Sequence, residues 1–273
     1  MATFTYQSKS IYYDMTGEDS TNVLLLLNGI MMSTKSWDPF IEGFAKQFTV
    51  LRVDFFDQGQ SEKMSEPYTQ AIQVDMLQAL LGYLKIESVY LAGISYGGSI
   101  ALQFTAKYPK FVKKLMVFNA TAHTSSWLKA IGDGWNAVAK HRDGEAYYHI
   151  TIPYIYSPRF YQENLAWMEA RKKLLVPLFS DGTFLDAITR LTISAETHDV
   201  RDSLSSIEVP TLVVASEHDF LTPPYEQKHL AENMPNAELI TFDGCGHASM
   251  YEKPKLFTST IIGFIQAEEN YTI

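Results

Sequence analysis

The sequence predicts a single-domain α/β protein built on a mostly parallel sheet of eight strands, with helices on both faces. Five continuous apolar runs carry this prediction, because the strands of a parallel sheet are buried on both sides and lack polar alternation. These runs span residues 23–27, 49–53, 89–92, 115–118 and 211–215. Parallel neighbours need long crossovers, and segments with apolar residues at helical spacing lie between most of the runs.

The two ends of the chain complete this sheet and its helical cover. Apolar and polar residues alternate over 4–6 and 11–13, which predicts two short antiparallel strands, and residues 239–242 predict a last short strand. Apolar residues repeat at helical spacing over 72–84 and over 257–265. In an open α/β sheet the loops at the carboxyl ends of the strands converge, so the functional site is expected there.

The segment 121–206 interrupts the alternation of strands and helices. It contains no convincing buried strand, and it is dense in aromatic residues: Trp127, Trp135, Tyr147, Tyr148, Tyr154, Tyr156, Phe160, Tyr161, Trp167, Phe179 and Phe184. We expect a helical lid here, inserted into a core formed by residues 1–120 and 207–273. Most of these aromatic residues should form the core of the lid, and the rest should line an apolar pocket.

Charge and cysteine content exclude several kinds of partner. The chain has 22 Lys and Arg residues against 31 Asp and Glu residues, a net charge of −9. This balance repels phosphate groups, so neither nucleic acid nor an anionic membrane is an expected partner. Cys245 is the single cysteine, which excludes an intramolecular disulfide, and no apolar stretch is long enough to span a bilayer. We expect a cytoplasmic protein that acts on a small molecule; its oligomeric state stays open.

A reactive serine is predicted at the end of one buried strand. Gly93-Ile94-Ser95-Tyr96-Gly97 has the pattern Gly-x-Ser-x-Gly, between a predicted strand at 88–92 and a predicted helix at 96–108. A strand, a tight turn and a helix in this order form a nucleophile elbow, which exposes the serine hydroxyl at the turn. The flanking glycines keep the strained turn free of Cβ clashes.

A serine hydroxyl needs a neighbouring base and an acid that orients the base, and the chain offers both. Asp219 lies on a loop after a predicted strand and four residues before Pro223, which closes the loop. Glu217 is the competing carboxylate, and its alternative role is to cap or solvate the strand end. His247 lies on a glycine-flanked loop after the last strand. The order Ser95, Asp219, His247 is therefore the predicted catalytic order.

With these motifs the chain resembles the α/β-hydrolase fold superfamily, in particular its small lidded lactonase and esterase-like members. The resemblance covers nearly the whole chain and is weakest in the lid. It implies an oxyanion hole formed by two backbone N–H groups, those of Tyr96 and Ile30, with Met31 as the alternative to Ile30. The chain departs from the family pattern in having Asn28-Gly29 in place of His-Gly. It also has Asp57-Gln58-Gly59 where Gly-His-Gly is common, and this loop is expected to be structural.

These residues predict a serine hydrolase that cleaves a small, mostly apolar carboxylic ester or lactone through an acyl-enzyme. Other chemistry of the superfamily stays open, namely thioester hydrolysis, carbon–carbon bond hydrolysis and cofactor-free perhydrolysis. A serine nucleophile argues against a dehalogenase, which would have Asp, and against a dienelactone hydrolase, which would have Cys. A non-catalytic ligand sensor is the alternative from another class.

Substrate contacts, cofactors and metals are less constrained by the sequence. Adjacency to the catalytic loops or to the lid suggests five substrate contacts: Met31, Trp127, Phe220, Leu221 and Met250. No phosphate-binding glycine motif occurs, and the histidines other than His247 lack metal-ligand spacing, so neither a cofactor nor a metal is expected. Cys245 lies two residues before His247, either exposed near the site or packed as a small residue.

Overall fold

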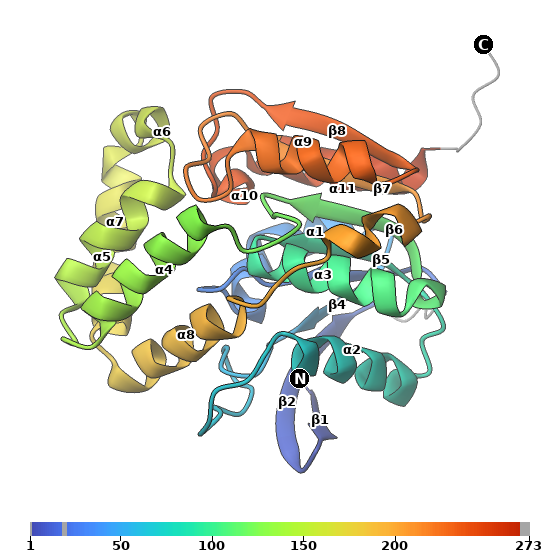
Figure 1. The fold of residues 1–273 in the computed structure, drawn as a ribbon, viewed down its shortest axis with the longest axis horizontal. Helices are drawn as coiled ribbons and strands as arrows, with labels where there is room; N and C mark the ends of the chain where they lie inside the picture. The colour runs from blue at the N-terminus through green and yellow to red at the C-terminus, as the bar shows by residue number, and fades with distance from the viewer. Residues whose placement is uncertain (1, 18–20, 268–273) are drawn as a thin grey trace.

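The computed structural model describes residues 2–17 and 21–267, and it confirms the predicted fold class (Figure 1). Eight strands form one sheet in the order β1-β2-β4-β3-β5-β6-β7-β8. The strands are β1 (Ala2–Tyr6), β2 (Lys9–Thr16), β3 (Val23–Leu27), β4 (Thr49–Val53), β5 (Val89–Ile94), β6 (Val112–Phe118), β7 (Thr211–Ser216) and β8 (Ala237–Phe242). The pairs β1–β2 and β2–β4 are antiparallel, and all other neighbours are parallel.

The continuous apolar runs have a simple structural cause, because both faces of the central strands are buried. In β3 every residue is fully buried. Leu25 and Leu27 belong to the hydrophobic core on one face of the sheet, whereas Leu24 and Leu26 belong to the core on the other face. A strand with this environment has no solvent-facing side, so it shows no alternation.

Helices cover the two cores. The helices of the α/β core are α1 (Asp38–Ala45), α2 (Ala71–Leu84), α3 (Tyr96–Lys107), α9 (Pro224–Asn233), α10 (Ser249–Glu252) and α11 (Pro254–Gln266). Leu80 of α2 and Phe104 of α3 are buried in one core. Phe44 of α1 and Phe257 of α11 are buried in the other. The sheet therefore lies between two helical layers, as predicted.

Five helices are inserted between β6 and β7 and lie beside one end of the sheet (Figure 1). They are α4 (Ser126–Ala139), α5 (Gly144–Ile155), α6 (Pro158–Glu163), α7 (Leu165–Phe179) and α8 (Gly182–Ser194). Aromatic side chains fill the space between them: Tyr147 packs edge-on against Phe179 at 5.0 Å between ring centres, and Tyr156 stacks on Phe160 at 5.7 Å. The predicted division of the chain at 121–206 stays a prediction. Of the helices in the described ranges, none has the length and apolar character needed to cross a bilayer.

Candidate active site

Ser95 occupies a strained turn between β5 and α3. Its backbone has φ 52° and ψ −116°, a conformation that a residue with a side chain rarely adopts. Its N–H donates to the Phe118 carbonyl at 2.9 Å, which fixes the turn against the neighbouring strand. The glycines have a steric reason: a Cβ on Gly93 would lie 2.3 Å from the Gly97 carbonyl oxygen, and one on Gly97 would lie 2.4 Å from the Leu27 carbonyl oxygen.

The predicted acid and base meet in the structure, although 28 positions separate them in the chain. His247 Nδ1 lies 2.7 Å from Asp219 Oδ2, and both residues are buried. An ionised carboxylate only accepts hydrogen bonds, so Nδ1 is the protonated ring nitrogen and Nε2 is left as an acceptor. Glu217, the competing carboxylate, lies half-exposed and accepts the N–H of Gly244 at 2.6 Å.

The Asp219 carboxylate is held by three residues, and the sequence singled out only one of them, Leu221, and for substrate contact. Oδ1 accepts the backbone N–H groups of Leu221 and Thr222, each at 2.9 Å. Oδ2 accepts the Thr222 hydroxyl at 2.8 Å and the Asn119 side-chain amide at 2.9 Å. These donors compensate the burial of the charge and fix the direction in which the carboxylate faces His247.

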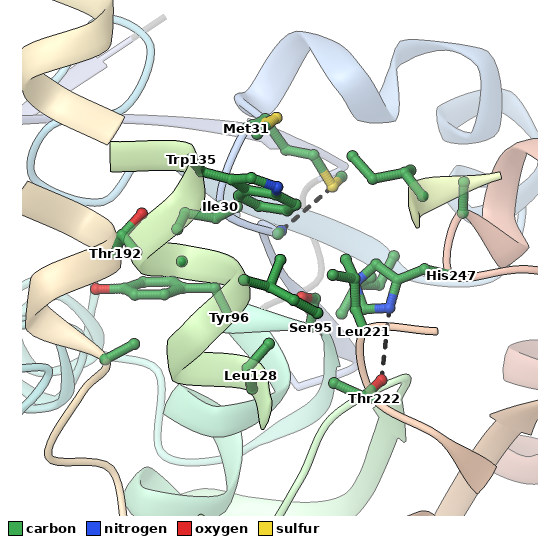
Figure 2. Close-up of a pocket in the computed structure, with 18 of the residues that line it drawn as sticks. Ile30, Met31, Ser95, Tyr96, Leu128, Trp135, Thr192, Leu221, Thr222 and His247 are labelled. Carbon is green, nitrogen blue, oxygen red and sulfur yellow. Dashed lines mark hydrogen bonds between the residues drawn. The ribbon is translucent and has the colours of Figure 1, made fainter. Parts of the chain in front are cut away.

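A cavity of about 190 Å³ opens onto both Ser95 and His247 (Figure 2). Its wall is mostly apolar, with side chains that include Ile30, Met31, Leu128, Trp135, Leu221 and Met250. Ser95 comes from the elbow, His247 from the loop after β8, and Leu128 and Trp135 from α4 of the insert. The structure thus brings the predicted serine and histidine to one pocket between the sheet and the inserted helices.

Three of the five predicted substrate contacts line this cavity: Met31, Leu221 and Met250. Trp127 and Phe220 do not, contrary to the expectation. Both side chains are about half-exposed, and the Trp127 indole N–H donates to the Phe220 carbonyl at 2.8 Å. Adjacency along the chain does not fix where a side chain points, so it does not predict which residues line the pocket. Their contact joins α4 to the loop that carries Asp219.

The loop after β3 carries one predicted oxyanion donor, the N–H of Ile30. The Gln58 side chain fixes this loop by two hydrogen bonds. Its amide group donates to the Gly29 carbonyl at 2.8 Å and to the Ile30 carbonyl at 3.3 Å. The Gly29 carbonyl and the Ile30 N–H belong to one planar peptide and point in opposite directions, so fixing the first directs the second. Asn28 donates to Gln58 Oε1 at 3.0 Å and accepts from the Trp37 indole at 2.7 Å. Asn28 and Gln58, which replace the usual family residues, therefore form one buried network.

Tyr96 supplies the other predicted donor. It is the first residue of α3, and the N–H groups of a helical first turn have no partner inside the helix. Its side chain extends away from Ser95 and shares a 2.8 Å hydrogen bond with the Ser194 hydroxyl of α8. The same residue thus lines the cavity and connects the elbow to the insert.

The loop that carries His247 is hydrogen-bonded to the insert. The Glu252 carboxylate accepts the N–H of Gly246 at 3.1 Å, and it also accepts the Ser157 N–H at 2.8 Å and hydroxyl at 2.6 Å. On the other side of the histidine, the Ala248 N–H donates to the Ile155 carbonyl at 2.9 Å. The position of His247 therefore depends on contacts between α10 and the end of α5.

Cys245 is a packed residue and does not face the cavity. Its side chain is fully buried, and this burial raises the pKa of the thiol to about 12. Such a thiol is protonated at neutral pH and is a poor nucleophile. Of the two alternatives that the sequence left open, an exposed thiol near His247 or a packed small residue, the structure therefore shows the packed residue.

No group of three or more His, Cys, Asp or Glu side chains within residues 2–17 and 21–267 is arranged to hold a metal ion. His198 illustrates what a buried histidine does here instead. Its Nε2 lies 2.8 Å from the Thr121 carbonyl and its Nδ1 lies 3.1 Å from the Gln103 amide. Burial lowers the pKa of His198, so the ring is neutral and serves hydrogen bonding.

Comparisons with known proteins concern the family and the fold of the chain. A family model described as the alpha/beta hydrolase fold matches residues 22–254. A protein of Azorhizobium caulinodans named "Putative carbamate hydrolase RutD" is 27% identical over 255 residues, which cover 93% of this chain and 94% of that protein. The crystal structure of MGS-M2, described as an alpha/beta hydrolase enzyme from a Medee basin deep-sea metagenome library, is 58% identical over all of both chains, with a TM-score of 0.98. Est816, described as an N-acyl homoserine lactone degrading enzyme, is 26% identical over 96% of this chain and 100% of that chain, with a TM-score of 0.80.

Proposed function

Because this chain belongs to the α/β-hydrolase family of enzymes, we propose that it hydrolyses a small, mostly apolar carboxylic ester or lactone with Ser95 as nucleophile. One observation carries the proposal. His247, which is hydrogen-bonded to Asp219 at 2.7 Å, lines the same cavity as the serine of the strained elbow. A base oriented by a buried acid, next to a serine held at an elbow, is the arrangement that acyl transfer requires.

Acylation of the enzyme uses each group once. His247 Nε2 accepts the Ser95 proton as the serine oxygen bonds to the carbonyl carbon of the substrate. The carbonyl oxygen becomes negatively charged, and the N–H groups of Ile30 and Tyr96 stabilise it. When the carbon–oxygen bond to the leaving group breaks, His247 returns the proton to the departing oxygen. In a lactone that oxygen remains attached to the acyl chain as a hydroxyl.

Deacylation repeats these steps with water. His247 takes a proton from water while the water oxygen attacks the acyl carbon, and it then protonates Ser95 as the carboxylic acid leaves. Asp219 keeps its negative charge throughout and stabilises the imidazolium form of His247. The donors around Asp219 support this role, because they hold its carboxylate in a fixed orientation.

The size and lining of the cavity support a small acyl group. A dry apolar cavity of about 150 Å³ admits benzene, so about 190 Å³ suits a substrate on the order of one ring or a short chain. The similarity to Est816 supports lactone hydrolysis, and the similarity to the RutD protein adds carbamates to the candidate substrates. Thioesters, carbon–carbon cleavage and perhydrolysis stay as further alternatives.

A substrate survey with matched serine variants tests the proposal. Short p-nitrophenyl esters, lactones, thioesters and carbamates would be offered to the wild type, to Ser95→Ala and to Ser259→Ala, an exposed serine of α11. We expect turnover and fluorophosphonate labelling in the wild type and in Ser259→Ala, and neither in a folded Ser95→Ala. Labelling or full turnover in Ser95→Ala would refute the assignment. Thermal stabilisation by substrates without turnover in the wild type would instead identify a ligand sensor.

A further inference from the structure

Two long basic side chains line the cavity, and their environments differ. Lys129 of α4 forms ion pairs with Glu196 at 2.8 Å and with Asp133 at 3.2 Å. Its charge is therefore compensated within the protein. Arg171 of α7 has no ion pair with any carboxylate of the described residues, so its charge is the one available to a bound molecule.

Arg171 is held in place by aromatic rings. Its guanidinium carbon lies 4.5 Å from the ring centre of Tyr251 and 5.3 Å from that of Trp167. These contacts stabilise the cation and fix the plane of the guanidinium. The phenol groups of Tyr156 and Tyr251 also interact with the guanidinium, but they leave one of its N–H groups without an acceptor. The Arg171 Nε is buried and has no hydrogen-bond partner among the described residues. A buried charged donor without an acceptor is costly, so an acceptor brought by a ligand would be favourable.

The cavity wall near Arg171 adds two tyrosine side chains. Tyr156 and Tyr251 line the same cavity as Arg171. Burial raises the pKa of Tyr156, and the positive charge of Arg171 opposes the shift only in part. The Tyr156 phenol is therefore protonated at neutral pH and can donate a hydrogen bond. A fixed guanidinium with the neutral Tyr156 phenol beside it is suited to a carboxylate, which accepts in two directions.

We propose that the cavity takes an ester or lactone that carries one carboxylate, which Arg171 binds while the reacting carbonyl lies at Ser95. This inference rests on the function proposed above and adds a charge requirement to it. The apolar lining between these groups accommodates the hydrocarbon part of the substrate. Among the described residues that line the cavity, Arg171 is the one Lys or Arg without an ion pair, so in a chain of net charge −9 the cavity fits a monoanion better than a polyanion.

A matched pair of esters tests the charge requirement. Monomethyl adipate and methyl hexanoate have the same chain length and differ in a terminal carboxylate, and their hydrolysis can be followed by pH-stat titration. We expect the wild type to prefer monomethyl adipate. In Arg171→Met the ratio of kcat/KM values should fall about 10- to 100-fold, the range for loss of a charged hydrogen bond, mainly through KM. In Arg171→Lys, which keeps the charge, the ratio should fall less.

The controls separate a binding role from a structural one. Arg159→Met removes an exposed arginine of α6 that pairs with Glu163, and it should leave the ratio unchanged. Equal loss of activity toward both esters in Arg171→Met and Arg171→Lys would make Arg171 a packing residue and overturn the proposal. A wild type that hydrolyses both esters but does not prefer the anionic one would also overturn it, and this result needs no variant to fold.

A binding measurement separates this proposal from the proposed function. Calorimetric titration of Ser95→Ala with monomethyl adipate reports binding without turnover. Binding that weakens about 10-fold or more when Arg171→Met is added supports the carboxylate site even if the wild type hydrolyses neither ester. Absence of binding in Ser95→Ala, with hydrolysis of neutral esters intact in the wild type, would overturn the carboxylate site and leave the serine hydrolase assignment standing.

Discussion

Replacing Gln58 with methionine removes the side-chain amide that hydrogen-bonds the loop after β3, the loop that carries the predicted oxyanion donor of Ile30. In the wild type this buried side chain donates to the Gly29 carbonyl at 2.8 Å and to the Ile30 carbonyl at 3.3 Å. Methionine has nearly the same length and can fill the same space, but it has no N–H to donate. The substitution therefore tests whether the direction of the Ile30 N–H depends on a residue that does not touch the substrate.

The size of the effect follows from the bonds that are lost. The Gly29 carbonyl keeps the Met32 N–H at 3.1 Å, so the loop is loosened and not released. The Ile30 carbonyl and the Asn28 amide each lose the hydrogen bond that Gln58 gave them. Leaving a buried polar group without a partner lowers the free energy of unfolding by about 1–3 kcal/mol. Removal of an oxyanion donor lowers kcat about 10²–10³-fold, and a misdirected donor should give a smaller loss, about 10- to 100-fold. KM should stay within about twofold, because the interaction matters most in the transition state.

The assay is steady-state hydrolysis of the best ester found in the substrate survey, together with urea unfolding. Gln60→Met is the matched control, since Gln60 lies in the same loop with its side chain exposed. We expect Gln60→Met to behave as the wild type in both measurements. If Gln58→Met has a lowered free energy of unfolding but a kcat within about twofold of wild type, Gln58 supports the fold only and the positioning argument is wrong.

Three further predictions concern a buried ion pair and a buried thiol. Arg190→Met should lower the free energy of unfolding by about 3–5 kcal/mol, because it removes the cation that lies 2.6 Å from the fully buried Asp57 carboxylate in the wild type. In urea unfolding, adding Asp57→Asn to this variant should restore part of the lost stability. A loss below about 1 kcal/mol in Arg190→Met would contradict the argument. Native Cys245 should resist iodoacetamide at pH 8, because a pKa of about 12 leaves about one thiol in 10⁴ ionised, whereas urea should permit alkylation, detected by mass spectrometry. Since folding raises this pKa above its usual 9.0, the stability from the neutral thiol is complete below about pH 9 and is lost as the pH rises toward 12. The wild type should therefore lose stability above pH 9 relative to Cys245→Ala, and parallel pH profiles for the two proteins would contradict this.

The strands were predictable because the burial of each strand determines its local pattern of apolar and polar residues. The apolar run of β3 has five buried residues because both of its faces meet a core, and the alternation near the start of the chain became the antiparallel β1 and β2. The elbow at Ser95 was predictable for the same reason, since a strand, a glycine-flanked serine and a helix are contiguous. Asp219 and His247 lie on the loops that follow the neighbouring strands β7 and β8, so the shared sheet edge brings them together.

What the sequence did not reveal depends on contacts between distant segments. Asn119 follows β6, and its contact with Asp219 lies 100 positions away. Nothing local to Gln58 indicates that it reaches the Gly29 carbonyl. The insert was harder still, because α7 brings Arg171 to the cavity only through packing of the inserted helices against one another, and no motif encodes that packing.

The insert shapes the pocket, and through the hydrogen bonds of Glu252 it also helps to position His247. One carboxylate contacts both Gly246, beside the histidine, and Ser157, the N-cap residue of α6. Exchange of the insert between family members is an attractive route to new substrates. A transplanted segment without a hydroxyl at position 157 would, however, remove one hydrogen bond from the Glu252 carboxylate, which also contacts the loop of His247. Directed evolution of the insert should therefore keep Ser157 and vary the wall at Leu128 and Trp135, where specificity can change without moving the base.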